Sequence, residues 1–273
     1  MPDMQSFVAS VSTRIARRAA EYAAEVDRDE VPEQAALDAF TTHVEVILTG
    51  YDPPSVRRRS DGLVFVHLYA AARHPKPDEE GWRVPSAVLA ALLAAEVEFR
   101  GPLRLSTRQN ALLAEEYERL GAQLWDLRLY AHAALAFRRA VALYRMNEDD
   151  DGEDRCGLRL ARSRTRALPR GWRRWAGQLS YVSCGHGFRP SWLLGWVAVQ
   201  LVLFTIAGLL LSGSPSPTTI VYMTATSFLN PQGQGDTAGL HAAARPLFAV
   251  ESWAGVVSMS VFFALLVRKW FRM

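Results

Sequence analysis

Residues 191–211 (SWLLGWVAVQLVLFTIAGLLL) and residues 247–267 (LFAVESWAGVVSMSVFFALLV) form two almost uninterrupted apolar runs. An α-helix rises about 1.5 Å per residue, so a helix over either run is long enough to cross the roughly 30 Å hydrocarbon core of a bilayer. The sequence therefore predicts two transmembrane helices. The segment between them is too long for a tight hairpin and too apolar for an ordinary exposed loop, so we expect it to re-enter the membrane.

Basic residues are unevenly placed around the two runs. Arg245 is the one arginine or lysine between them, whereas Arg268, Lys269 and Arg272 follow the second run. Arginines also precede the first run, at positions 155, 159, 162, 164, 166, 170, 173 and 174. Because basic residues concentrate on the cytoplasmic side of a membrane, the pattern predicts a multi-pass protein of the plasma membrane with both termini in the cytoplasm.

Composition divides the chain of 273 residues into three parts. Residues 1–147 are expected to form a cytoplasmic helical domain, and residues 190–273 the transmembrane domain. Between them, residues 148–189 begin with an acidic run and then turn basic, which is typical of a charged linker, here with a segment along the inner membrane surface. A formal net charge of +3 gives no argument for nucleic acid as a partner.

The first 146 residues carry apolar positions at helical spacing. No stretch of them is typical of a strand, and the N-terminal segment has arginines among its apolar residues, unlike a signal peptide. The fold class is therefore all-α, with a cytoplasmic helical domain followed by a two-span hairpin that holds a re-entrant loop. Helices are expected near residues 4–26, 33–48, 62–73, 86–99, 107–121 and 127–146.

The last predicted helix pair, residues 114–147, has a regular pattern of large and small residues: Tyr117, Leu120, Gly121, Tyr130, Ala133, Phe137 and Ala140. The pattern resembles one tetratricopeptide repeat, in which large residues pack two antiparallel helices and small ones let them approach. Leu124 and Arg145 depart from the family, and residues 85–113 show no second copy. The earlier helices are therefore divergent repeats, or the pair is an ordinary hairpin. The resemblance implies a surface for a protein partner.

No pattern in the chain is typical of an enzyme. The histidines are scattered, and HExxH, a glycine-rich phosphate loop and G-x-S-x-G are all missing from the sequence. Cys156 and Cys184 both lie on the predicted cytoplasmic side and form no C-x-x-C pair, so we expect neither a disulfide nor a metal site. We predict no catalytic residues, no metal and no cofactor.

The segment between the two apolar runs begins with a helix signal. Ser216 and Pro217 are typical of an N-cap and a first helical residue, and a short helix is expected as far as Phe228. Its β-branched residues favour a strand by propensity, but an unpaired strand would leave backbone groups unsatisfied in lipid. Glycine-rich residues follow, so the predicted re-entrant loop covers residues 217–236.

Short motifs around this loop resemble the two-span, pore-loop potassium channels of the bacterial type. They are GHGFRP at 185–190, GQGD at 233–236 and the basic pair at 268–269, and the resemblance covers about residues 180–273. It implies a homotetramer, with an outer helix, a pore helix, an extended filter whose carbonyls replace the hydration shell of a monovalent cation, and an inner helix. It also implies that the pore is supported by Tyr222, Thr224, Phe228, Glu251 and Gly255.

The filter departs from the family, which has ThrValGlyTyrGly before Asp. Aligned on both glycines, this chain reads Pro231, Gln232, Gly233, Gln234, Gly235 and Asp236. Proline removes a backbone donor, and one glutamine replaces the aromatic residue that braces the filter against the pore helix. Potassium selectivity is therefore not implied. The filter is non-selective, selects another ion, or belongs to a protein that no longer conducts.

Glu251 has two possible roles near the outer end of the second run. It is either a buried hydrogen-bonding group that supports the pore loop or a carboxylate that reaches the membrane interface.

Three classes of function follow from the sequence. The first is a tetrameric, channel-like membrane protein that passes cations under the control of its cytoplasmic domain. The second is a membrane-anchored interaction protein of tetratricopeptide type that does not conduct. The third, with the least support, is an enzyme tethered to the membrane. In all three the lipid bilayer is a partner, and a protein partner on the helical domain is expected in the second.

Overall fold

The computed structural model describes residues 4–28, 33–53, 62–79, 82–169, 171, 190–211, 216–229 and 245–270. Over these residues the chain has ten helices and no strand, which confirms the all-helical prediction. It divides into two compact units, residues 1–174 (unit 1) and residues 175–273 (unit 2).

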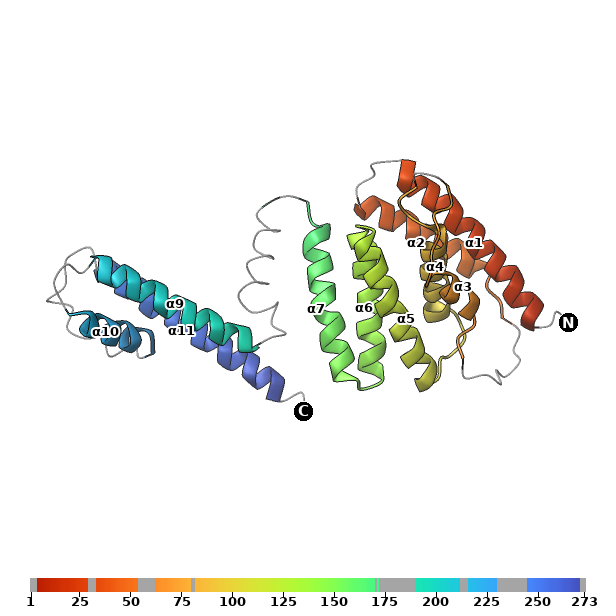
Figure 1. Cartoon of the computed structure of the whole chain (residues 1–273). Coiled ribbons are helices and arrows are strands. Elements are labelled where there is room, and N and C mark those ends of the chain that lie inside the picture. Colours follow the sequence, from red (N-terminus) through yellow and green to blue (C-terminus); the bar gives the residue numbers. More distant parts are fainter. Residues whose placement is uncertain are drawn as a thin grey trace. The chain divides into compact units, whose positions relative to one another are not determined.

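The helices of unit 1 lie close to the predicted ranges, except that α3 is shorter and α7 is additional (Figure 1). In the described part of this unit they are α1 (Met4–Arg28), α2 (Glu33–Thr49), α3 (Val66–Ala71), α4 (Ser86–Arg100), α5 (Thr107–Asp126), α6 (Tyr130–Met146) and α7 (Asp150–Ala167).

Helix α4 is the central helix of unit 1. It contacts α1, α2, α3 and α5, and every residue from Val88 to Glu98 is buried. A helix built from Ala, Leu and Val on all sides has no polar face to turn to water, so it is stable only inside a core. The core around it is one continuous cluster that runs from Val11 in α1 to Cys156 in α7.

Two carboxylates lie inside this core, and both are bound. Glu96 accepts two hydrogen bonds from the guanidinium of Arg139, each 2.8 Å long, which links α4 to α6. Glu98 accepts from the backbone N–H groups of Val64 and Phe65 at 2.7 and 2.9 Å, at the start of α3. Burial of a charge is tolerated where such partners replace water. The carboxylates therefore connect α4 to its neighbours.

Two turns of the same type join α5, α6 and α7, which lie side by side (Figure 1). They cover residues 127–129 and 147–149, and their middle residues, Arg128 and Glu148, have φ of 63° and 57°. In each turn the third residue donates its N–H to the carbonyl five residues earlier, over 2.9 Å in the first turn and 3.0 Å in the second. This bond is typical of a Schellman helix end. α7 thus follows α6 as α6 follows α5.

Helix α7 differs from the charged linker expected over residues 148–189. Its N-terminal end is capped by Asp149, whose carboxylate accepts from the N–H of Gly152 at 2.9 Å. Acidic residues fill its first turn and arginines its last, an arrangement that the helix macrodipole favours. Cys156 and Ser163 are buried against the rest of unit 1. The high charge of this segment masks the few positions that α7 buries, so the sequence did not predict the helix. Because α7 packs on the rest of unit 1, the unit extends beyond the predicted boundary at residue 147.

Two glycines allow the close approach of these three helices. A Cβ built on Gly121 in α5 would lie 2.8 Å from the ring of Phe137 in α6. One built on Gly152 in α7 would lie 2.6 Å from the ring of Tyr144, also in α6. Both rings are buried. Helix α6 therefore packs one aromatic ring against a glycine on each side.

His132 of α6 is buried in the same core, against Tyr22 and Phe40. The Tyr22 hydroxyl donates to the carbonyl of Ala36 at 2.7 Å and lies 2.6 Å from Nε2 of His132. A hydroxyl that donates its one hydrogen to Ala36 accepts from Nε2, so Nε2 of His132 carries a proton. Burial lowers the pKa of His132 to about 4.

Unit 2 contains, in its described residues, α9 (Pro190–Leu211), α10 (Pro217–Leu229) and α11 (Arg245–Trp270). Within α9 and α11, the stretches Leu194–Leu211 and Pro246–Ala264 are long and apolar enough to span a membrane. They match the two runs from which the spans were predicted.

The packing of α5 on α6 can be tested by Gly121→Val. The added side chain would collide with the Phe137 ring, and such overpacking lowers the free energy of unfolding by about 1–3 kcal/mol. Thermal unfolding of the purified full chain, followed by far-UV circular dichroism, measures the loss. Ala122→Val is the matched control, because Ala122 faces a pocket. Equal stability of the two variants would contradict the close contact.

The buried His132 predicts a pH dependence of stability. Its pKa is about 4 in the folded state and about 6.5 when exposed. The unfolded state therefore takes up a proton first, so stability is full above pH 6.5 and falls by about 3 kcal/mol as the pH drops toward 4. Denaturant unfolding of the full chain at several pH values should show this fall. It should be smaller in His132→Phe and unchanged in His67→Gln, which alters an exposed histidine.

Candidate functional site

Helix α10 packs against both long helices of unit 2. It contacts α9 and α11, and these two contact each other. It begins at Pro217, as predicted, and the hydroxyl of Ser216 accepts from the N–H of Thr219 at 3.3 Å. Its 13 residues extend about 20 Å, less than the roughly 30 Å of a bilayer core. Unit 2 thus combines two helices of membrane-spanning length with one that is too short to span.

The C-terminal end of α10 meets α11 at Gly255. A Cβ built on Gly255 would collide with the carbonyl oxygen of Phe228 and lie 3.0 Å from its carbonyl carbon. The Phe228 side chain is buried as well. No residue larger than glycine fits here without a shift of α10, so this glycine fixes where the negative end of the α10 dipole lies against α11.

Glu251 and Thr224 are buried one helical turn from this contact, on α11 and α10 respectively. Glu251 has no exposed surface, and Thr224 is 1% exposed. Within the described residues, neither carboxylate oxygen of Glu251 and not the Thr224 hydroxyl has a hydrogen-bond partner. A carboxylate reaching the interface would lie at the surface of the unit. The position of Glu251 therefore favours the buried role, while its predicted hydrogen bond to the pore loop stays a prediction.

The other predicted site residues do not join this contact. The side chain of Tyr222 is 70% exposed and points away from the packed face of α10. The predicted filter lies outside the described residues: Pro231, Gln232, Gly233, Gln234, Gly235 and Asp236. The structure therefore brings together Phe228 and Gly255 and buries Thr224 and Glu251 beside them.

A polar contact joins the two long helices. The hydroxyl of Ser258 in α11 donates to Oε1 of Gln200 in α9 at 3.0 Å. Sequence analysis did not select this pair, although Gln200 is an amide in an otherwise apolar run. A hydrogen bond between two apolar helices stabilises their pairing where no water competes for it.

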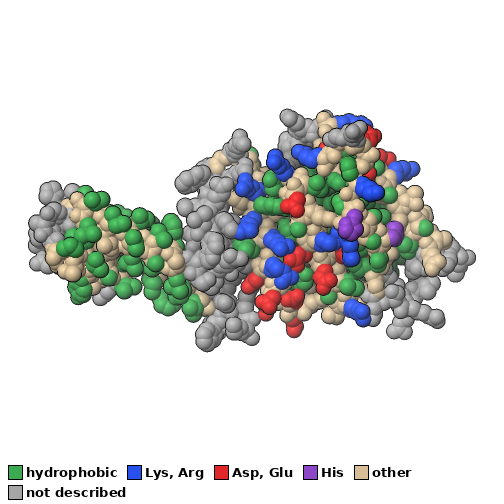
Figure 2. All heavy atoms as spheres, viewed as in Figure 1, with side chains coloured by type: hydrophobic (Ala, Val, Ile, Leu, Met, Phe, Trp, Pro, Cys, Tyr) green, Lys and Arg blue, Asp and Glu red, His purple; other side chains and the backbone are tan. Residues whose placement is uncertain are grey.

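The outer surface of unit 2 is apolar, whereas the surface of unit 1 mixes charges of both signs (Figure 2). On α9 the side chains of Val202 and Leu210 are 57% and 80% exposed, and on α11 that of Trp253 is 69% exposed. The buried residues of the unit include polar ones, such as Glu251 and Ser258. Polar groups inside and apolar groups outside are the reverse of the pattern in a water-soluble domain.

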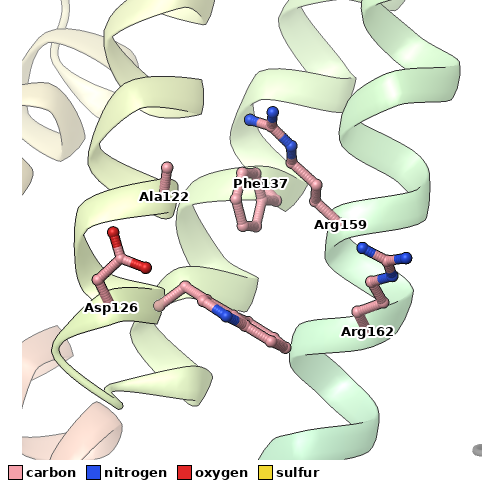
Figure 3. Close-up of a pocket in the computed structure, with 6 residues that line it drawn as sticks. Ala122, Asp126, Phe137, Arg159 and Arg162 are labelled. Atoms are coloured by element: carbon pink, nitrogen blue, oxygen red, sulfur yellow. The ribbon is translucent and has the colours of Figure 1, made fainter.

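A second candidate site lies in unit 1, where a pocket of about 180 Å³ opens between α5, α6 and α7. Figure 3 shows Asp126 of α5 on one side, Arg159 and Arg162 of α7 on the other, and Phe137 of α6 between them. Trp125 also lines the pocket, and its ring packs edge-on against Tyr130. The pocket offers cationic, anionic and aromatic groups together, a combination suited to a peptide side chain or terminus.

Glu118 positions the arginines beside this pocket. It accepts from Arg155 Nε at 2.8 Å and from Arg159 Nη1 at 3.1 Å, and the Tyr144 hydroxyl donates to it at 3.0 Å. The hydrogen bond from Arg155 lowers the pKa of the Glu118 carboxyl, although its partial burial opposes this. Arg159 is therefore held by a carboxylate that stays ionised at neutral pH.

The described residues contain no cluster typical of metal binding or nucleophilic catalysis. They include no group of three or more His, Cys, Asp or Glu side chains placed to hold a metal. Burial raises the pKa of the Cys156 thiol to about 12, and the nearby Glu118 adds to the rise. A thiol with that pKa is almost fully protonated at neutral pH and is a poor nucleophile.

Comparisons of the chain with family models, with curated proteins and with solved structures found no match.

The contact at Gly255 predicts that an alanine substitution has different effects on stability at two glycines of unit 2. Gly255→Ala should displace α10 and lower the free energy of unfolding by about 1–3 kcal/mol, the usual effect of overpacking. Gly195→Ala is the control, because a Cβ there meets nothing within 4 Å in one chain and alanine favours a helix. Thermal stability of the detergent-purified chain measures both. A Gly255→Ala variant as stable as Gly195→Ala would contradict the contact.

Proposed function

We propose that the protein is a membrane-embedded, channel-like assembly whose subunits each contribute α9, α10 and α11 to a pore for monovalent cations. The observation that carries the proposal is α10, a helix too short to span, packed beside two helices of spanning length. A short helix that enters the bilayer and turns back is tolerated there when protein surrounds it. The resemblance of residues 180–273 to pore-loop channels is the reason for proposing ion permeation through this arrangement.

The apolar surface of α9 and α11 supports insertion into a bilayer. Side chains such as Leu210 and Trp253 would be costly to expose to water and are favourable in lipid. The basic residues that flank the two spans, with Arg245 alone between them, support cytoplasmic termini in the plasma membrane. In this orientation unit 1 is cytoplasmic.

The proposal is limited to passive flow of monovalent cations through a homotetramer. Gly233 and Gly235 retain the backbone freedom that a carbonyl-lined filter needs. Pro231, Gln232 and Gln234 lack the chemistry of the potassium-selective motif, so we propose no selectivity for potassium. We also propose no catalytic step, in keeping with the sequence of the chain.

A second function is favoured by the pocket between α5, α6 and α7. A peptide with an acidic group and an apolar side chain would pair with Arg159 and Arg162 and pack on Trp125 and Phe137. The tetratricopeptide resemblance of residues 114–147 points to the same use. In this alternative the protein is a membrane-anchored interaction protein, and α9 and α11 serve only as its anchor.

Flux through reconstituted protein separates the two functions. Liposomes containing the full chain should take up monovalent cations, and Gly235→Ala should change the rate because a side chain there alters the filter backbone. Gly195→Ala should leave the rate unchanged, since that site is open within one chain. Absence of flux, together with partner binding that survives replacement of residues 190–273 by an unrelated hairpin, would favour the anchor instead.

A further inference from the structure

Seven arginines of α6 and α7 fall into two groups according to their ion pairs, whereas Arg162 lines the pocket and belongs to neither group. In the first group, Arg139 binds Glu96, Arg145 binds Glu153, and Arg155 and Arg159 bind Glu118. Each of these arginines faces a carboxylate of unit 1, but Arg155 and Arg159 share one, so this group has one positive charge in excess. That excess lies at Glu118, beside the pocket between α5, α6 and α7.

The second group is Arg138 in α6 with Arg164 and Arg166 in α7, which we name the α7 cationic patch. All three side chains are exposed, and none of them has an ion pair to any residue that the structure describes. Burial and the charges of Arg139 and Arg164 lower the pKa of Arg138, while the charge of Glu96 opposes the fall, so Arg138 and Arg164 lie within electrostatic range of each other. The patch therefore has an unbalanced positive charge.

The macrodipole of α7 explains only part of this arrangement. Arg164 and Arg166 lie in the last turn of α7, where a positive charge stabilises the helix. Arg138 lies in the middle of α6 and gains nothing from that dipole. Arg138 and Arg164 thus bring like charges from two helices near one another, which costs stability unless an anion covers them.

The position of the α7 cationic patch in the sequence indicates which kind of anion would cover it. Residues 168–189 alone separate α7 from α9 in the sequence. From Arg155 to Gly235 the sequence contains no aspartate or glutamate, and the connecting residues add Arg170, Arg173, Arg174 and Arg189. Basic residues beside a membrane span bind the anionic lipids of the cytoplasmic leaflet.

We propose that the α7 cationic patch binds anionic phospholipid headgroups of the leaflet that α9 enters. The inference rests on the proposed function in one respect, the insertion of α9 and α11 into a bilayer. It is independent of whether the pore conducts. Lipid binding would hold the end of α7 at the membrane surface, so the lipid composition would act on the helical unit that precedes the spans.

The test uses the full chain in nanodiscs of phosphatidylcholine, alone or mixed with phosphatidylglycerol. A dye is attached at Leu168→Cys, next to the patch, in a chain that also carries Cys184→Ser. Quenching of the dye by a lipid with a nitroxide headgroup reports how close α7 lies to the surface. We expect stronger quenching in the anionic discs, a loss of the difference in high salt, and no effect of inorganic phosphate in neutral discs.

Two triple variants with the same net charge complete the experiment. Arg138→Gln/Arg164→Gln/Arg166→Gln should weaken the surface association on the order of a hundredfold, because each basic residue contributes a factor of about five. Quenching should then fall to its value in neutral discs. Arg17→Gln/Arg104→Gln/Arg108→Gln, at exposed sites elsewhere in unit 1, should quench like the parent. Circular dichroism confirms that both variants fold.

Three outcomes overturn the inference. The first is equal quenching in neutral and anionic discs, and the second is an equal loss of quenching in the two triple variants. In either case the protein is still inserted, so the proposed function is unaffected. The third is failure of the chain to elute with the discs, which overturns the proposed function and the inference together.

Discussion

Exposing the apolar outer surface of unit 2 to water costs a large free energy, and the environment of the whole chain follows from this constraint. Large apolar side chains are exposed along both long helices of the unit, such as Leu194 and Leu210 on α9 and Val256 and Phe263 on α11. A soluble domain buries such residues in its core. Unit 2 instead buries Glu251, Ser252 and Ser258. A bilayer, as in the proposed function, satisfies the apolar half of this pattern.

The buried carboxylates show how differently the two units are built. In unit 1, Glu96 and Glu98 each have hydrogen-bond donors from a neighbouring helix or turn, so the core around α4 is complete in one chain. In unit 2, Glu251 is equally buried but has no partner among the described residues. A buried acid without a partner is costly. If the protein assembles as proposed, we expect the partner of Glu251 in the loop that follows α10 or in a second copy.

Local signals made much of this fold predictable. Ser216 and Pro217 predicted the start of α10, and two apolar runs predicted the long helices, because capping and hydrophobicity act over short distances. Helix α7 was missed, since a helix with few buried positions among many charges has the composition of a linker. The pocket between Asp126, Phe137 and Arg162 was missed for another reason: it joins three helices, and no spacing in the sequence encodes that meeting.

For the candidate site, the sequence predicted individual residues but not how they pack against one another. Thr224, Phe228, Glu251 and Gly255 were selected from a family resemblance, and all four are buried at the α10–α11 packing, but Tyr222 is exposed. Propensity gives no means to decide which face of α10 packs, because apolar and hydroxyl-bearing residues are mixed around that helix. The pairing of Gln200 with Ser258 depends on the register of two long helices, which the sequence of either one leaves open.

The central claim is that α10 and its flanking helices form one part of a pore that several chains complete. The mass of the protein within a detergent micelle, measured by light scattering with correction for bound detergent, tests this most directly. The account predicts four copies in the particle, as in other pores built from one re-entrant loop per chain. A particle that holds a single copy at every protein concentration would contradict it.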